Sequence, residues 1–70
     1  MTQHTFRLEG EFVELNGLLK AMGLASSGGA AKAMIAAGAV MVGGEIESRI
    51  RRKLRGGDVV RVGDEEILVV

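Results

Sequence analysis

Residues 15–38 read LNGLLKAMGLASSGGAAKAMIAAG, and this stretch decides the fold. In its first third, apolar residues recur at the i, i+3, i+4 and i+7 spacing of an amphipathic helix, at Leu15, Leu18, Leu19 and Met22. Gly23 follows, and a glycine in this place suits the left-handed residue that closes many helices. The pattern therefore predicts a first short helix over residues 15–22.

A second helix is indicated by the pair Ser26-Ser27, either of which can cap a helix N-terminus. Ala31, Met34 and Ile35 form an apolar stripe after the cap, and Gly38 again suits a closing position. Two short helices joined by three or four residues form a helical hairpin.

The flanking segments favour strands. Phe6 and Leu8 would share one face of a short strand that ends at Gly10. Two β-hairpins are predicted after the helices, one over 40–42 and 45–47 and one over 59–62 and 65–70. The predicted fold class is α+β, with two helices on one side of a small, mostly antiparallel sheet.

The length of 70 residues allows one domain, over 1–70. No cysteine is present, so neither a disulfide nor a thiolate zinc site is available. No apolar run approaches the ~20 residues of a membrane span, and no signal peptide is recognisable. We therefore expect a cytoplasmic protein without a membrane partner. The aromatic residues Phe6 and Phe12 are predicted to lie in the core, which leaves no ring for stacking on bases.

The charges are segregated although the net charge is zero. Residues 49–55 read RIRRKLR and carry five positive charges, and residues 20–55 carry an excess of five. The remaining segments, 1–19 and 56–70, carry excesses of two and three negative charges. Clustered cations attract a polyanion such as nucleic acid. The alternative is a solvated basic loop, and the overall pI of about 6.6 is below that usual for nucleic-acid binders.

An extended conformation of residues 49–55 would place four cations on one face, at Arg49, Arg51, Lys53 and Arg55. Ile50 and Leu54 would then point to the core. Arg52 would point inward as well, so a turn or bulge is predicted near Arg51-Arg52.

The start of the second helix is another candidate site. Glycine within a helix costs ~1 kcal/mol relative to alanine, and Gly28 and Gly29 follow Ser27 directly. Their small size would let a phosphate reach the free N–H groups, with the Lys32 charge one turn away. The alternative is that the glycines only ease a tight turn. Lys20 is interpreted as a solvated lysine on the polar face of the first helix.

No motif supports catalysis. Ser26 and Ser27 have no His or Lys base close in sequence, and the glycine run lacks the Lys-Ser/Thr ending of a phosphate-binding loop. His4 is isolated, without the further ligands that a metal site needs. We therefore predict no enzyme, no catalytic residue, no cofactor, no metal and no small-molecule substrate.

The order of the motifs resembles the RNA-binding domain of small-subunit ribosomal protein four (the S4 domain), and most closely its small stand-alone bacterial members. The likeness covers residues 11–62. The residues that carry it are Leu15-x-x-Leu18-Leu19-Lys20-x-x-Gly23-Leu24, Ser27-Gly28-Gly29-x-Ala31-Lys32, Ile35, Gly38-x-Val40-x-Val42, Arg49-x-Arg51-x-Lys53-Leu54 and Gly57-Asp58-x-Val60.

The resemblance implies a helical pair on a small curved sheet, the alpha-L RNA-binding motif, with a basic surface formed by the helices and the adjacent loop. By matching positions it implies RNA contacts at Ser27, Lys32, Arg51, Arg52 and Lys53, with Lys20 and Arg49 as further candidates. Gly28, Gly29 and Arg55 complete the candidate set from the residues themselves. Glu14 and Gly28 stand where many members have arginine.

The sequence thus predicts a non-catalytic, monomeric RNA-binding module that contacts the backbone of structured RNA, rRNA or tRNA, with ribosomal particles among the expected partners. Recognition through shape and phosphates suits a surface without aromatic side chains. The alternative is an adaptor or assembly factor whose basic face docks an acidic protein.

Overall fold

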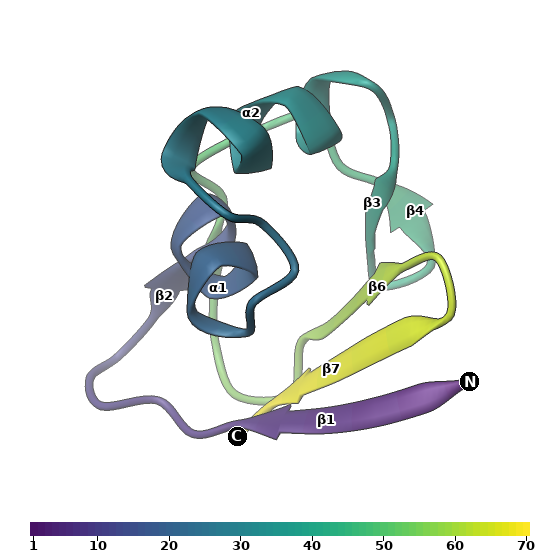
Figure 1. Ribbon diagram of the computed structural model, residues 1–70. Helices are drawn as coiled ribbons and strands as arrows, with labels where there is room; N and C mark the ends of the chain where they lie inside the picture. The colour runs from purple at the N-terminus through teal and green to yellow at the C-terminus, as the bar shows by residue number, and fades with distance from the viewer.

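The structure is a computed structural model that describes residues 1–70. Helices α1 (Leu15–Ala21) and α2 (Gly28–Ala36) pack on one side of the strands, as Figure 1 shows. This arrangement confirms the predicted α+β fold. The seven strands are β1 (Thr2–Phe6), β2 (Val13–Glu14), β3 (Val40–Val42), β4 (Glu45–Ile46), β5 (Lys53–Leu54), β6 (Val59–Val62) and β7 (Glu65–Val69).

Five of the strands form one sheet in the order β1-β7-β6-β3-β4. Every neighbouring pair is antiparallel except β1 and β7, which run parallel along the edge of the sheet (Figure 1). Both predicted hairpins are present. The first strand ends at Phe6 rather than at Gly10, because β1 follows β7 only as far as the pair Phe6–Val69. The sheet is thus mixed but mostly antiparallel.

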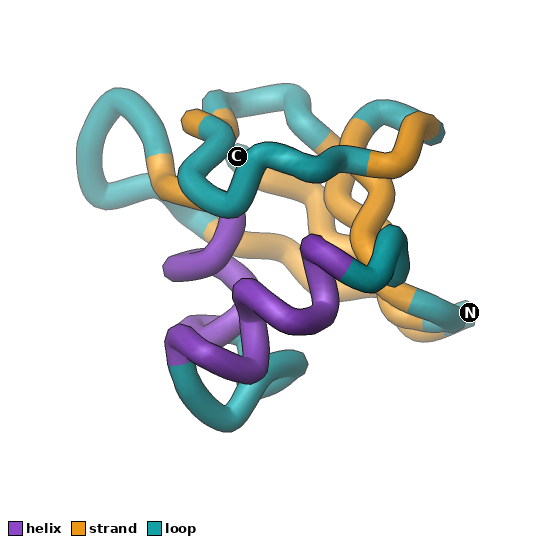
Figure 2. Tube along the Cα trace, turned by 90° about the horizontal axis from the view of Figure 1, so that it is seen from above, coloured by secondary structure: helices purple, strands orange, loops and turns teal.

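The helix ends lie close to the positions that the capping serine and the closing glycines predict. Gly23 and Gly38 follow α1 and α2 with φ of 74° and 76°, a conformation that glycine adopts without strain. The Oγ atom of Ser27 accepts a hydrogen bond of 3.1 Å from the N–H of Ala30 and so caps α2. Seen from above in Figure 2, the helices lie together beside the strands.

Twelve buried apolar residues form the core between the helices and the sheet. Leu54 is among them, and its buried side chain anchors the basic stretch of residues 49–55 to the core. Phe6 is half-buried and packs against this cluster. The prediction that Phe12 lies in the core is wrong, since 40% of this residue is exposed. Phe12 instead precedes a small second sheet that the sequence did not indicate, in which β2 pairs with β5.

Candidate nucleic-acid interface

The basic segment, residues 49–55, is anchored to the core by two of its side chains. Ile50 is half-buried against the core and Leu54 is fully buried. Between them the chain turns, and the N–H of Arg52 donates to the carbonyl of Arg49 at 3.3 Å. The predicted turn near Arg51-Arg52 is therefore confirmed. Only Lys53–Leu54 is extended, as strand β5.

Helix α1 holds the basic segment through backbone hydrogen bonds. The N–H groups of Leu15 and Asn16 donate to the carbonyls of Arg52 and Ile50 at 2.9 and 3.1 Å. These amides belong to the first turn of α1, where no carbonyl of the helix itself can accept them. Glu14 at the cap position makes no side-chain capping bond. The segment thus serves as the N-terminal cap of α1, which fixes its backbone.

Two arginines of the segment converge on one buried carboxylate, that of Glu47. Nη2 of Arg49 and Nη1 of Arg52 lie 3.0 and 2.7 Å from Glu47 Oε1. Side-chain and backbone hydrogen bonds from Arg49, together with the bond from Arg52, hold the pKa of Glu47 well below its usual range. The same carboxylate raises the pKa of Arg49.

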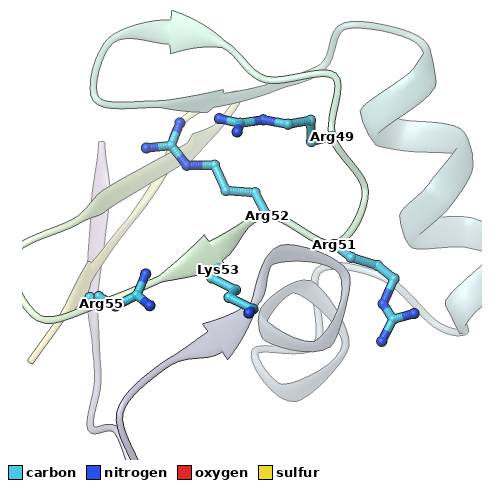
Figure 3. A pocket seen from close by; sticks show the side chains of 5 residues that line it. All are labelled: Arg49, Arg51, Arg52, Lys53 and Arg55. Atoms are coloured by element: carbon cyan, nitrogen blue, oxygen red, sulfur yellow. The ribbon is translucent and has the colours of Figure 1, made fainter.

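Arg51 points to the other side of the segment from Arg49 and Arg52, as Figure 3 shows. Its Nε atom donates to Oε2 of Glu14 at 2.9 Å. The fully extended conformation, which would place Arg49, Arg51, Lys53 and Arg55 on one face, is not adopted, because the turn at Ile50-Arg51 breaks the alternation of an extended chain.

Lys53 and Arg55 carry the unpaired charges of the segment. No carboxylate lies within ion-pair distance of the Lys53 ammonium or the Arg55 guanidinium. Both cations lie instead over the ring of Phe12, at 5.0 and 5.9 Å from its centroid. The ring is thus in contact with the two cations that have no carboxylate partner.

The cationic side chains of the segment line one open groove of about 590 Å³, shown in Figure 3. No apolar residue lines it, and its lining is Arg49, Arg51, Arg52, Lys53 and Arg55. Five cations beside the paired carboxylates of Glu14 and Glu47 leave a formal local charge of +3. Such a surface attracts an anion, while its polar lining offers no pocket for an apolar ligand.

The other candidate residues lie on the helices or, in the case of Ser27, at the N-cap of α2, outside the lining of the groove. Lys20 is exposed in the last turn of α1, and Lys32 is exposed on α2. The amide protons of Gly28 and Gly29 in the first turn of α2 have no acceptor within the protein. Both glycines have ordinary φ angles, and a Cβ atom would meet nothing closer than 3.9 Å at either position. The fold itself therefore does not require glycine there.

One histidine pairs with a carboxylate away from the basic segment. His4 Nε2 lies 2.6 Å from Oε2 of Glu65, at the pair of strands β1 and β7. No three His, Asp or Glu side chains are grouped so that they could hold a metal ion. Neither helix has the length and apolar character needed to cross a membrane.

Sequence reasoning missed three residues at this site: Glu14, Glu47 and Phe12. Both carboxylates neutralise arginines of the basic segment, and the ring contacts its two remaining cations. The only local signal was the proximity of Glu47 to Arg49 in the sequence. The pairings of Glu14 and Phe12 join residues about 40 positions apart and depend on the pairing of β2 with β5.

Comparison with known proteins identifies a family and similar solved structures. A family model described as an S4 domain matches residues 6–70. The solution structure of YbcJ from E. coli, described as an alpha-L motif involved in RNA-binding, superposes with a TM-score of 0.74. That protein is 39% identical to this chain, and the alignment covers 100% of this chain and 90% of YbcJ. No curated protein sequence matches closely.

Proposed function

Because the chain belongs to the S4 domain family, we propose that it is a non-catalytic RNA-binding protein whose basic segment contacts the phosphate backbone of structured RNA. Family membership and the description of YbcJ both support RNA as the ligand. The observation that carries the proposal is the groove lined by five cationic side chains and no apolar one.

The groove suits a phosphate backbone because its charges are held in place before binding. Leu54 is anchored in the core, and the carbonyls of Ile50 and Arg52 are bonded to α1. Ordered cations lose less conformational entropy on binding than cations on a mobile tail. Lys53 and Arg55 are the strongest candidates for direct contact, since neither side chain is neutralised by a carboxylate.

The start of α2 supplies a second proposed contact. The free amides of Gly28 and Gly29 can donate to a phosphate oxygen at a helix N-terminus, and the Ser27 hydroxyl can donate while it accepts from Ala30. Lys32 adds a charge one turn further on, and Lys20 extends the basic surface on α1. Helices α1 and α2 pack against each other, and α1 is bonded to the basic segment.

Duplex regions of rRNA or tRNA are the proposed ligands, bound by a monomer in the cytoplasm, and a ribosomal particle can present such RNA. A-form RNA is recognised through its shape, phosphates and 2′-hydroxyls, which a shallow basic groove can contact. No feature of the structure favours the alternative of an acidic protein partner over RNA.

The test is a titration of a hairpin RNA against the protein at increasing salt. Each phosphate contact releases counterions, so the logarithm of the association constant should fall linearly and steeply with the logarithm of the salt concentration. Hairpins of different sequence should bind alike. A flat salt response, or no binding at physiological salt, would overturn the proposal.

A further inference from the structure

Phe12 is held at the surface beside the basic groove by strand pairing. It precedes Val13, which pairs with Leu54 in the small second sheet, so the ring lies next to the cations on either side of Leu54. Of the two aromatic residues in the chain, Phe6 packs against the core and Phe12 leaves 40% of its surface exposed. An exposed ring at the edge of a cationic groove is the arrangement with which proteins stack a nucleic-acid base.

A pocket of about 380 Å³ opens beside the same ring. This volume lies within the range of pockets that hold small organic ligands, about 300 to 1,000 Å³. Its lining combines four apolar side chains with two charged ones and a glycine: Phe6, Leu8, Phe12 and Val13 with Arg7, Glu9 and Gly10. Apolar walls suit the faces of a planar base, and Arg7 and Glu9 supply a donor and an acceptor for its edge.

Phe12 therefore contacts two unlike environments. Its ring lies under the unpaired charges of Lys53 and Arg55, and it also lines the half-apolar pocket. A nucleotide has the same two parts, an anionic phosphate and a planar base. We propose that Phe12 and this pocket receive one unpaired base of the bound RNA while Lys53 and Arg55 hold the phosphates next to it. This inference rests on the proposed RNA-binding function and specifies which part of the RNA the protein selects.

A purely structural role for the ring would have a different effect on RNA affinity. If Phe12 serves only to support the side chains of Lys53 and Arg55, its contribution is the same for paired and unpaired RNA. Stacking on a base instead adds about 1 to 3 kcal/mol, which is a factor of about 5 to 150, and only where a base is free to leave its helix. Comparison of two RNAs that differ at one nucleotide separates these roles.

The experiment uses two hairpin RNAs of the same stem sequence, each closed by a glycol linker that carries no bases in place of a loop. One contains a single bulged 2-aminopurine, and in the other this base is paired with uridine. We expect the wild-type protein to bind the bulged hairpin more tightly and to change the fluorescence of its 2-aminopurine on binding. Phe12→Leu keeps apolar bulk without a ring and should bind the bulged hairpin about 5- to 100-fold more weakly. Its affinity for the paired hairpin should not change.

Two further variants guard against a folding artefact. Phe12→Trp should retain the preference for the bulged hairpin, because indole stacks at least as well as benzene. Leu68→Ala removes an apolar side chain that is 42% exposed on β7, outside the pocket beside Phe12, and should leave both affinities unchanged.

Equal wild-type affinities for the two hairpins, or an unchanged preference in Phe12→Leu, would overturn this inference and leave RNA binding itself intact. Failure of the wild-type protein to bind either hairpin at low salt would overturn the proposed function and this inference with it.

Discussion

Nη1 of Arg52 lies 2.7 Å from Oε1 of Glu47. This ion pair distinguishes the cations that are bound to a carboxylate of the protein from those whose charge is unpaired. Glu47 is buried and also accepts from Arg49, so one carboxylate fixes two guanidinium groups. Lys53 and Arg55 have no such partner. A substitution at Arg52 therefore tests the fold as well as the interface, whereas substitutions at Lys53 and Arg55 test the interface.

Glu47→Gln should destabilise the protein at pH 7 by roughly 1.5 to 3 kcal/mol, because the amide keeps only one of the two acceptor oxygens and removes the charge that pairs with Arg49 and Arg52. In the wild-type protein the pKa of Glu47 is lowered on folding from its ordinary value of 4.5. The stabilisation is thus complete above about pH 5 and is lost as the pH falls through 4.5 and below. Urea unfolding at pH 7 and pH 3 measures both effects.

The matched control is Glu45→Gln on strand β4, since Glu45 is exposed and forms no ion pair. It should leave both the stability at pH 7 and the loss of stability at low pH nearly unchanged. If Glu47→Gln loses as much stability between pH 7 and pH 3 as the wild-type protein does, the role assigned to Glu47 is wrong.

Lys53→Gln combined with Arg55→Gln should weaken binding to hairpin RNAs of any sequence. Each lost phosphate contact should reduce the slope of the logarithm of affinity against the logarithm of salt by about 1, so the double variant should lose about 2. The free energy of unfolding should change little, because neither side chain is in an ion pair. Arg61→Gln is the control, since Arg61 is exposed on β6 next to the inward-facing Val60. An equal loss of slope in the control would contradict a localised interface.

Gly28→Ala should stabilise the fold by up to about 1 kcal/mol and at the same time weaken RNA binding. Alanine favours the helix, and its Cβ atom would meet open space in the free protein. The added methyl group would stand between the amides and a phosphate. Gly17→Ala in α1 is the control, because its Cβ space is equally open and it is outside the candidate site.

Thermal unfolding measures the stability of both glycine variants, and titration with RNA measures their affinity. Opposite changes in stability and affinity for Gly28→Ala, with no loss of affinity for Gly17→Ala, would support a phosphate contact at the start of α2. Undiminished RNA affinity in Gly28→Ala would show that no phosphate contacts the start of α2 at Gly28.

The sequence predicted those features of the fold that depend on near neighbours. The spacing of Leu15, Leu18 and Leu19 and the closing glycines Gly23 and Gly38 define both helices locally. Glycines in the turn between β3 and β4 likewise defined the first hairpin, since Gly43 and Gly44 both have positive φ. The parallel pairing of β1 with β7 joins the two ends of the chain, and no local pattern indicates it.

The sequence predicted which residues belong to the candidate site, but it did not predict where their side chains point. Counting charges located the segment 49–55, but the direction of each side chain depends on one turn at Ile50-Arg51. Phe12 was assigned to the core because an aromatic residue is usually buried. Its exposure follows from the pairing of Val13 with Leu54, which faces the ring toward Lys53. Contacts of this kind join distant residues and become visible only in the folded chain.

Glu14→Gln should increase the affinity for RNA. Glu14 accepts from Arg51 at 2.9 Å and places a negative charge beside the groove where a phosphate would bind. Two unit charges 4 Å apart in water interact by about 1 kcal/mol, so removal of this carboxylate should raise affinity about fivefold at low salt. The cost in stability should stay below about 1 kcal/mol, since Arg51 is largely exposed.

Two comparisons show whether the gain comes from Arg51. Asp64→Asn makes the same change in net charge in the turn between β6 and β7. It should raise affinity much less than Glu14→Gln does, because Asp64 neither lines the groove nor pairs with one of its cations. In a chain that already carries Arg51→Gln, the further change Glu14→Gln should give a smaller gain than it gives alone. Equal gains in RNA affinity with and without Arg51 would show that Glu14 acts only through its own charge. Arg51, once released from Glu14, would then not bind a phosphate.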